Sequence, residues 1–343
     1  MNLQDALARI AEGADLSQDE TAAAFHIIMS GEATPAQIGA LLTGLRVKGE
    51  TPAEIAGAAT TMRALSTKVE VSHPNLIDTC GTGGSGSKLF NISTAAAFVA
   101  AAAGAKVAKH GNRKMTSFCG SADVLEAAGV NLALTPEQIG RCITDVGVGF
   151  MFAQAHHSAM RFAGPVRQEI GIRTMMNVLG PMTNPAGARR QVIGVFDTFW
   201  QTKMAQVLRI LGSEHALIVH SDGLDEIRLD APSHIVELKD GQIESYTVDP
   251  SDLGVANHPQ AAIDALAAES VEHSLELVHQ SLADAASAPA EIVALNAGAG
   301  IYVAGIATSL ANGVAMAQDA ISSGLAKERL AELVRISKLM GEA

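Results

Sequence analysis

The first seventy residues show the spacing of amphipathic helices. Apolar side chains recur three and four positions apart, as at Ile38, Leu41, Leu42 and Leu45, which places them on one face of a helix. Three predicted helix starts carry a capping box, a Ser or Thr followed three residues later by Glu or Gln. The boxes are Ser17 with Glu20, Thr34 with Gln37 and Thr51 with Glu54, and Pro35 and Pro52 occupy first helical positions. We therefore predict an all-helical domain over residues 1–70.

From Asn75 onward, short apolar strands alternate with helices. The expected strands are Leu76–Thr79, Lys106–Lys109, Val148–Phe152, Gln191–Phe196, Ala216–His220, His234–Lys239 and Gln242–Val248. The last two flank Asp240-Gly241, a hairpin turn signal. Strands that alternate with helices are typical of a largely parallel sheet covered by helices. The predicted fold class is α/β, with a small all-helical N-terminal domain and a large domain, residues 71–343, around a central, mostly parallel sheet.

Three segments depart from this alternation. The stretch from His156 to Pro181 is more helical and rich in loops, and the chain from Ser287 onward predicts three further helices. The Ala- and His-containing segment Asn257–Glu269 is expected to be a surface excursion.

Composition narrows the class of protein. The chain has 343 residues, a net charge of −12 and no long basic run, which argues against a nucleic-acid or anionic-membrane surface. Three cysteines without CxxC spacing fit a reducing compartment. The N-terminus lacks the features of a signal peptide, and the longest apolar run, Ala95–Ala105, is too short to span a bilayer. We expect a cytoplasmic protein that binds neither nucleic acid nor membrane.

The stretch that carries most chemistry begins at the end of the first strand. It reads Asp78-Thr79-Cys80-Gly81-Thr82-Gly83-Gly84-Ser85-Gly86, and an Ala-rich helix is expected from about Ser93. Glycines after a strand let backbone N–H groups approach an anion, and a helix N-terminus adds partial positive charge. The second strand then delivers Lys109-His110-Gly111-Asn112-Arg113. Together these segments predict a phosphate site with a second anion clamp.

The glycine stretch also contains the pattern G-x-G-x-x-G, which alone suggests a dinucleotide site. Two features disfavour that hypothesis. Ser87 to Phe90 separate the glycines from the helix, and Lys106 stands about twenty residues on, where an acidic ribose ligand is expected.

An acidic loop, Asp222-Gly223-Leu224-Asp225-Glu226, follows another predicted strand. Alone it would be an ordinary surface loop. Beside a polyphosphate site, however, adjacent carboxylates are what Mg²⁺ needs in addition to phosphate oxygens and water.

These motifs, in this order over nearly the whole chain, resemble the anthranilate phosphoribosyltransferases. Further matching motifs are Asn91-Ile92-Ser93-Thr94, Gly120-Ser121-Ala122-Asp123, Arg173-Thr174, Asn177-Val178-Leu179-Gly180-Pro181 and Asn184-Pro185. The resemblance implies a magnesium-dependent transfer of the phosphoribosyl group from phosphoribosyl pyrophosphate (PRPP) to anthranilate in tryptophan biosynthesis, with release of pyrophosphate. It also implies that residues 156–182, roughly, join the helical domain and that two chains form a homodimer through that domain.

The resemblance assigns ligands residue by residue. PRPP would lie on Gly81, Gly84, Ser85, Leu89, Asn91, Ser93, Thr94, Lys109, His110, Gly111, Asn112, Arg113, Lys114, Met115, Thr116, Ser117 and Ser121. Anthranilate would contact Gly81, His110, Asn112, His157, Met160 and Arg167, and magnesium would be held by Ser93, Asp225 and Glu226. No residue is an obvious general base, so Lys109 and Arg167 are expected to act by orientation and charge.

Four features depart from the family pattern. Ser85 stands where Asp is usual, Phe118 and Cys119 stand where Lys and Ser are usual, and Met175-Met176 replaces a pair that is usually Ile-Phe. The alternatives are therefore a related transferase for a different aromatic amine, a pyrimidine-nucleoside phosphorylase, and a non-catalytic paralogue that binds nucleic acid.

Overall fold

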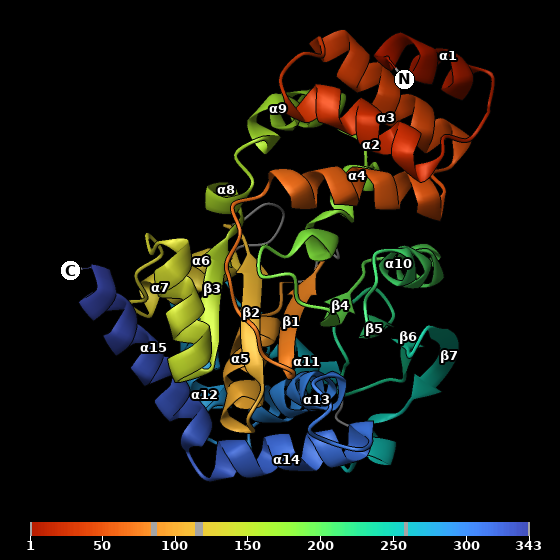
Figure 1. Ribbon diagram of the computed structural model, residues 1–343. Helices are drawn as coiled ribbons and strands as arrows, with labels where there is room; N and C mark the ends of the chain where they lie inside the picture. The colour runs from red at the N-terminus through yellow and green to blue at the C-terminus, as the bar shows by residue number, and fades with distance from the viewer. Residues whose placement is uncertain (1, 84–87, 114–118, 257–259, 342–343) are drawn as a thin grey trace.

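The computed structural model describes residues 2–83, 88–113, 119–256 and 260–341. Its N-terminal part is helical, as predicted, and lies at one end of the molecule (Figure 1). The helices are α1 (Leu3–Ala11), α2 (Gln18–Met29), α3 (Pro35–Lys48) and α4 (Pro52–Leu65). All three predicted capping boxes form, with both reciprocal hydrogen bonds in each, and both prolines begin their helices. Local sequence therefore sets where these helices start.

The rest of the chain builds a seven-stranded sheet in the order β3-β2-β1-β4-β5-β6-β7. The strands are β1 (Leu76–Gly81), β2 (Lys106–Gly111), β3 (Val148–Phe152), β4 (Arg190–Gly194), β5 (His215–His220), β6 (Ser233–Lys239) and β7 (Gln242–Val248). β1 to β5 pair in parallel, and β6 and β7 add antiparallel pairs. The mostly parallel sheet predicted from the sequence is confirmed.

Helices cover both faces of this sheet (Figure 1). The helices that follow α4 are α5 (Ile92–Ala102), α6 (Ser121–Ala127), α7 (Pro136–Arg141), α8 (Ala153–His156), α9 (Met160–Ile170), α10 (Phe199–Ile210), α11 (Gln260–Asp264), α12 (Val271–Ser281), α13 (Ala288–Val303), α14 (Leu310–Ser322) and α15 (Leu325–Gly341). Of these, α9 packs against α2 and α3 of the N-terminal part. Short turns of other helix types are η1 (Cys142–Val146), η2 (Met175–Asn177), η3 (Gly180–Thr183) and η4 (Pro250–Leu253). The last three helices confirm the prediction for the chain after Ser287.

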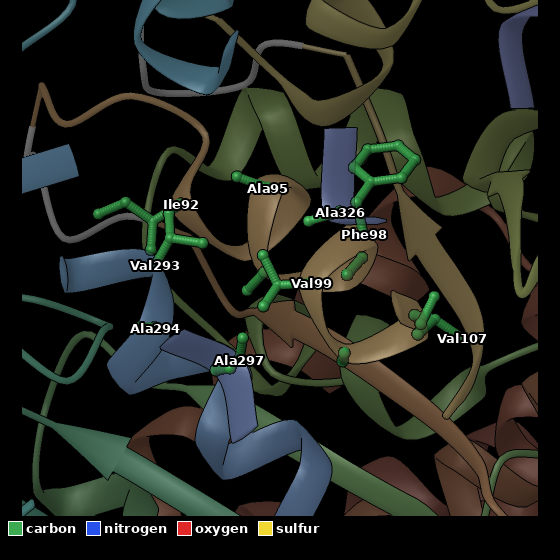
Figure 2. Packing of buried hydrophobic residues seen from close by; sticks show 14 of the residues in the cluster. Ile92, Ala95, Phe98, Val99, Val107, Val293, Ala294, Ala297 and Ala326 are labelled. Carbon is green, nitrogen blue, oxygen red and sulfur yellow. The ribbon is translucent and has the colours of Figure 1, made fainter. Parts of the chain in front are cut away.

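Small side chains let the covering helices pack closely. Figure 2 shows Phe98 and Val99 of α5 and Ala297 of α13 among the residues that fill one side of the sheet. Side chains of adjacent strand residues alternate between the faces, so Val192 joins this core while Ile193 joins a second core with α10 and the N-terminal helices. Ala, Val, Ile and Leu therefore make up most of the core on both sides of the sheet.

Two details of the sequence prediction need correction. β4 ends at Gly194 rather than at Phe196. The acidic loop crosses the chain at this point, where a Cβ on Gly194 would lie 1.7 Å from the Asp225 carbonyl oxygen. The surface excursion expected over Asn257–Glu269 is wrong for its described part, where Leu266 is fully buried. The backbone there bonds to residues 88 and 90, which ties it to the segment after the glycine stretch.

The strand order fixes where a ligand can bind. The chain adds β2 and β3 on one side of β1 and then returns to the other side with β4. In open parallel sheets, ligands bind outside the carboxyl ends of the strands at such a reversal. The glycine stretch follows β1 at this point. Among the described residues, no helix has both the length and the apolar character required to cross a membrane.

Candidate active site

Four parallel strands deliver polar loops to one edge of the sheet. Gly81, the last residue of β1, pairs in register with Gly194 of β4. The next residue, Thr82, donates its backbone N–H to the Gly194 carbonyl at 2.9 Å. The loops after β2 and β5 carry the basic and the acidic segments. The structure therefore brings together motifs that are far apart in the sequence.

Two adjoining cavities open at this edge. The first, about 280 Å³, is lined by Lys109, Arg113, Arg173, Asp225 and Glu226 among others, and we name it the charged cavity. The second, about 320 Å³, has a wall of His110, His157 and methionines in which Arg167 is the one charged side chain among the described lining residues, and we name it the neutral cavity. Both cavities are lined by Cys80, Gly81, Thr82, His110, Gly111, Asn112, Arg167 and Asn177.

Lys109 is the central cation of the charged cavity. Only 2% of the residue is exposed, and its Nζ donates to the Thr79 carbonyl at 2.6 Å and to Ser93 Oγ at 3.3 Å. Burial lowers the pKa of Lys109, while the carboxyls of Asp78 and Glu226 oppose that shift. The ammonium is thus fixed in position beside the acidic loop.

The acidic loop reaches the sheet because glycines leave room for it. A Cβ on Gly81 would lie 2.8 Å from an Asp225 carboxylate oxygen. The loop turns through Asp222 and Gly223, both with positive φ (43° and 85°), and Ser221 Oγ donates to the Glu226 carbonyl at 2.7 Å. Burial, with Asp225 alongside, raises the pKa of Glu226 to about 8. The loop thus brings two carboxyls together, and without a bound cation the buried Glu226 carboxyl keeps its proton near pH 7.

The residues expected to hold magnesium fit that ion. Ser93, Asp225 and Glu226 line one small recess and also the charged cavity. Among the described residues no group of three or more His, Cys, Asp or Glu side chains could hold a metal ion. One hydroxyl and two carboxylates are too few for a complete protein cage, but Mg²⁺ commonly keeps waters and takes phosphate oxygens. A divalent cation here would also compensate the acidic pair that raises the Glu226 pKa.

Two histidine rings, rather than several charged side chains, characterise the wall of the neutral cavity. The His110 and His157 rings pack edge to face with centroids 5.1 Å apart. Burial and neighbouring cationic groups lower the pKa of His110 to about 3 and that of His157 to about 4. Within the described chain, the Nε2 atoms of both rings are buried without a hydrogen-bond partner. Both rings are therefore neutral near pH 7.

Arg167 lies where the two cavities meet. It comes from α9, which packs against α2 and α3, and it lines both cavities. Burial lowers the pKa of its guanidinium, which nevertheless stays charged near neutral pH. Asn112 lines both cavities as well, and Met160 lines the neutral one. In the neutral cavity, Arg167 is thus the one charged side chain of the described wall, and Asn112 is one of its amides.

Other expected ligands occupy varied positions. Asn91 and Ser121 line the charged cavity. Arg113 lines it too, while its guanidinium pairs with Asp123 at 3.1 Å and Glu126 at 2.7 Å. Leu89 and Thr94 are not among the described lining residues of either cavity, and the Thr94 hydroxyl is buried in α5. Of the remaining expected ligands, Gly84, Ser85, Lys114, Met115, Thr116 and Ser117 lie outside the described residues, as does Phe118.

The structure adds lining residues to which the sequence assigned no role. Thr82, Arg173 and Asn177 line the charged cavity, and Met62 and Met176 line the neutral one. Thr82, Arg173 and Asn177 stand inside motifs that carry the family resemblance, which was an available signal. Met62 belongs to α4 of the helical part, and no local pattern indicates that it reaches the cleft.

Comparison with known proteins shows two matching family models. Residues 4–66 match the helical bundle domain of a glycosyl transferase family, and residues 73–327 match the a/b domain of such a family. An anthranilate phosphoribosyltransferase of Teredinibacter turnerae is 56% identical over 99% of this chain and 100% of its own length.

Solved structures have the same fold. An anthranilate phosphoribosyltransferase of Thermus thermophilus superposes with a TM-score of 0.91 at 41% identity, covering 97% of this chain and 99% of its own. An enzyme of that name from Saccharomyces cerevisiae, in complex with PRPP and Mg, has a TM-score of 0.86 at 22% identity, covering 98% of each chain. At that identity the second likeness concerns the fold alone.

Proposed function

Because the chain belongs to the anthranilate phosphoribosyltransferase family, we propose that it joins the amine of anthranilate to C1′ of PRPP and releases pyrophosphate. The observation that carries this proposal is the pair of adjoining cavities. One concentrates Lys109, Asp225 and Glu226, as a pyrophosphate with its metal requires. The other offers neutral rings and Arg167, as a flat aromatic acid requires. The reaction requires its two substrates side by side, and the adjoining position of the two cavities supports this assignment.

The charged cavity serves the leaving group. Bound Mg²⁺ would supply neutralisation of the pyrophosphate charge, with Ser93, Asp225 and Glu226 as its ligands. Lys109 adds a fixed positive charge, and because its Nζ is already held by Thr79 and Ser93, little reorganisation accompanies the departure of pyrophosphate. Backbone N–H groups of the glycine stretch and Asn91 complete the proposed PRPP site.

The neutral cavity serves the nucleophile. Anthranilate carries a carboxylate that suits the guanidinium of Arg167, and Asn112 lies on the same wall. The attacking aromatic amine is already neutral, so orientation at C1′ is the main requirement. Its nitrogen forms the new bond as the bond from C1′ to the pyrophosphate oxygen breaks, and the nitrogen then releases one proton to solvent or pyrophosphate. The neutral His110 and His157 keep positive charge away from the amine.

A fluorescence assay tests this function. Anthranilate fluoresces and its consumption is followed directly after PRPP and magnesium chloride are added, with omission of PRPP as the control. We expect loss of fluorescence that requires both PRPP and Mg²⁺, and stoichiometric release of pyrophosphate. Phosphate-dependent cleavage of a pyrimidine nucleoside, with no consumption of anthranilate, would contradict the proposal and support the nucleoside phosphorylase alternative.

We also propose that residues 1–70 and about 156–182 form one domain, and that two chains associate through it. α9 packs against α2 and α3, which supports this division. Val47 of α3 is 84% exposed, so a charge there probes association through this domain without disturbing its core. Sedimentation analysis should give a dimer, and Val47→Glu should shift it toward monomer. A monomeric parent protein would contradict this proposal.

A cytoplasmic location is our proposal as well. Cys80, Cys119 and Cys142 form no disulfide with one another, as expected in a reducing compartment. Cell fractionation tests this proposal, and recovery with membranes or outside the cell would contradict it.

A further inference from the structure

Asn177 lies in a short turn at the junction of the two cavities. It is the last residue of η2, and it lines both the charged and the neutral cavity, as Arg167 and Asn112 do. It is half-buried, next to the buried Met176. A side chain in this position can reach either substrate, so the direction of its amide decides what it can bind.

The turn itself settles the orientation of the Asn177 amide. The backbone N–H of Thr174 donates to Asn177 Oδ1 at 3.1 Å, and of the two polar atoms in a side-chain amide only the oxygen can accept. In the same turn, Thr174 Oγ1 accepts from the Met176 N–H at 3.3 Å. Within the described chain, nothing accepts a hydrogen bond from Asn177 Nδ2. Its two N–H groups are therefore left for a ligand in the cavities.

A buried carboxylate holds this turn from the side of the helical part. Glu50, in the loop between α3 and α4, accepts the backbone N–H of Met175 with Oε1 at 3.1 Å. Only 1% of Glu50 is exposed, and Lys203 of α10 donates to its carbonyl at 2.7 Å. Among the described residues, Glu50 Oε2 has no hydrogen-bond partner, and Arg46 Nη1 lies 3.9 Å from it. The one hydrogen bond of this buried carboxylate therefore goes to η2, which fixes the turn before a substrate enters.

Anthranilate presents one group that suits such a donor. A carboxylate has about four acceptor sites, and a guanidinium takes two of them in a bidentate pair. The carboxylate of anthranilate is ortho to the amine that attacks C1′, so an amine at the junction of the cavities brings the carboxylate there too. Arg167, Asn112 and Asn177 all line that junction. Three side chains with N–H donors therefore converge where one carboxylate must lie.

We propose that Asn177 donates its side-chain amide to the carboxylate of anthranilate, and that Glu50 is a positioning residue that acts on it through Met175. The inference rests on the proposed function, because that function supplies the aromatic acid. Carboxylate and phosphate oxygens both suit a guanidinium, so Arg167 alone separates them poorly. A neutral donor in a fixed position beside Arg167 adds selectivity for a planar carboxylate next to the amine.

Asn177→Asp separates binding from folding. Asp keeps an oxygen for the Thr174 N–H, and so keeps the turn, but it replaces the amide donor with a negatively charged acceptor. We expect KM for anthranilate to rise by roughly ten- to a hundred-fold, with PRPP affinity by calorimetry and the melting temperature near those of the parent protein. Asn312→Asp, at an exposed asparagine of α14, is the matched control and should leave all three unchanged.

Anthranilamide, in which a neutral amide replaces the carboxylate of anthranilate, supplies a readout that loss of structure would not give. Its amide N–H groups can donate to the carboxylate of the Asn177→Asp variant. This variant should therefore bind anthranilamide at least as tightly as the parent protein does, while it binds anthranilate more weakly. Equal losses for the two compounds would overturn the proposal, and so would a fall in PRPP affinity with unchanged KM for anthranilate.

The positioning role of Glu50 has its own pair of variants. Glu50→Ala removes the acceptor of the Met175 N–H and should raise KM for anthranilate severalfold, whereas Glu50→Gln keeps an acceptor and should raise it less. A Glu50→Ala protein with a lower melting temperature but an unchanged KM for anthranilate would contradict this role.

Fluorescence titration with anthranilate in the absence of PRPP keeps a failure of this inference apart from a failure of the proposed function. Anthranilate that binds the parent protein more tightly than the Asn177→Asp variant, but is not consumed with PRPP and Mg²⁺, would contradict the proposed function and support the inference. Anthranilate that both proteins consume with the same KM would overturn the inference alone.

Discussion

The charged and neutral cavities share a wall, yet the buried titratable groups of each have neighbours of different charge. In the charged cavity, acidic and basic groups converge: Lys109 is buried beside the carboxyl of Glu226, and each opposes the pKa shift that burial imposes on the other. In the neutral cavity, like groups converge: His110 and His157 lie beside one another and near further cationic groups, and their pKa values fall to about 3 and about 4. Burial penalises every charge, so the sign of the neighbours decides which group stays ionised.

The difference suits two chemically different substrates. A pyrophosphate with its metal needs fixed charges around it. A neutral aromatic amine needs uncharged surroundings, apart from one cation that pairs with its carboxylate. Arg167 is the exception on the neutral side, and it stands where the cavities meet. The following predictions test this division, beginning with the largest effect.

Removal of the buried cation should have the largest effect. Lys109→Met leaves the carboxyls of Asp78 and Glu226 without their nearby cation, and breaking a buried charge pair costs about 3–5 kcal/mol. We expect kcat/KM for PRPP to fall by roughly a hundred- to a thousand-fold, with a lower melting temperature. Lys106→Met is the control, since Lys106 lies at the other end of the same strand. A Lys109 variant with normal PRPP kinetics would remove this side chain from the proposed site.

Acid should destabilise the protein through the histidine pair. The groups facing these two rings are His156, Lys68 and Lys109. Because both folded-state pKa values lie below the unfolded value near 6.5, the unfolded chain binds more protons as the pH falls below 6.5. Stability is therefore full above about pH 6.5 and declines as the pH falls toward the folded values. We expect a loss of roughly 2–3 kcal/mol between pH 6 and pH 5 for the two rings together.

Urea unfolding at several pH values measures this loss. His157→Gln should reduce the pH dependence by about half. His26→Gln, at an exposed histidine of α2, should leave it unchanged. If the two variants showed the same pH dependence as the parent protein, the histidines would not be the groups held neutral.

Loss of the single cation on the neutral side should affect one substrate only. A carboxylate bonded to a guanidinium is worth about 1.5–3 kcal/mol, so Arg167→Ala should raise KM for anthranilate by roughly ten- to a hundred-fold. Affinity for PRPP should stay near normal by calorimetry. Arg161→Ala, at an exposed arginine on the same helix, is the matched control. A collapse of PRPP affinity instead would assign Arg167 to the charged side.

The acidic pair should set the magnesium requirement. Asp225→Asn removes one carboxylate from the proposed ligand set, and we expect about a tenfold rise in the Mg²⁺ concentration for half-maximal activity, or roughly 1.4 kcal/mol, with lower kcat. Asp222→Asn is a close control, because its side chain in the same loop is 92% exposed and Asn tolerates its positive φ. Equal magnesium dependence in both variants would exclude Asp225 from the metal site.

Local sequence determined much of the architecture. The capping boxes at Ser17, Thr34 and Thr51 each act within four residues, so they form wherever the chain is placed. The same holds for the hairpin at Asp240-Gly241, whose two residues both take the positive φ that the turn requires (51° and 79°). The approximate positions of the parallel strands were also predictable, and with them the edge of the sheet where the glycine, basic and acidic segments meet.

Only the tertiary structure decided how these segments meet. Several contacts join parts of the chain that have no local pattern in common. They lie between Gly194 and Asp225, between α4 and the neutral cavity, and between residues 88–90 and 266–268. Burial is likewise a property of the assembled fold, and it separates neutral His110 from charged Lys109 although they are neighbours in the sequence. Strand alternation places their side chains on opposite faces of the sheet, and the neighbours met there, rather than the residue types, decide which of them carries charge.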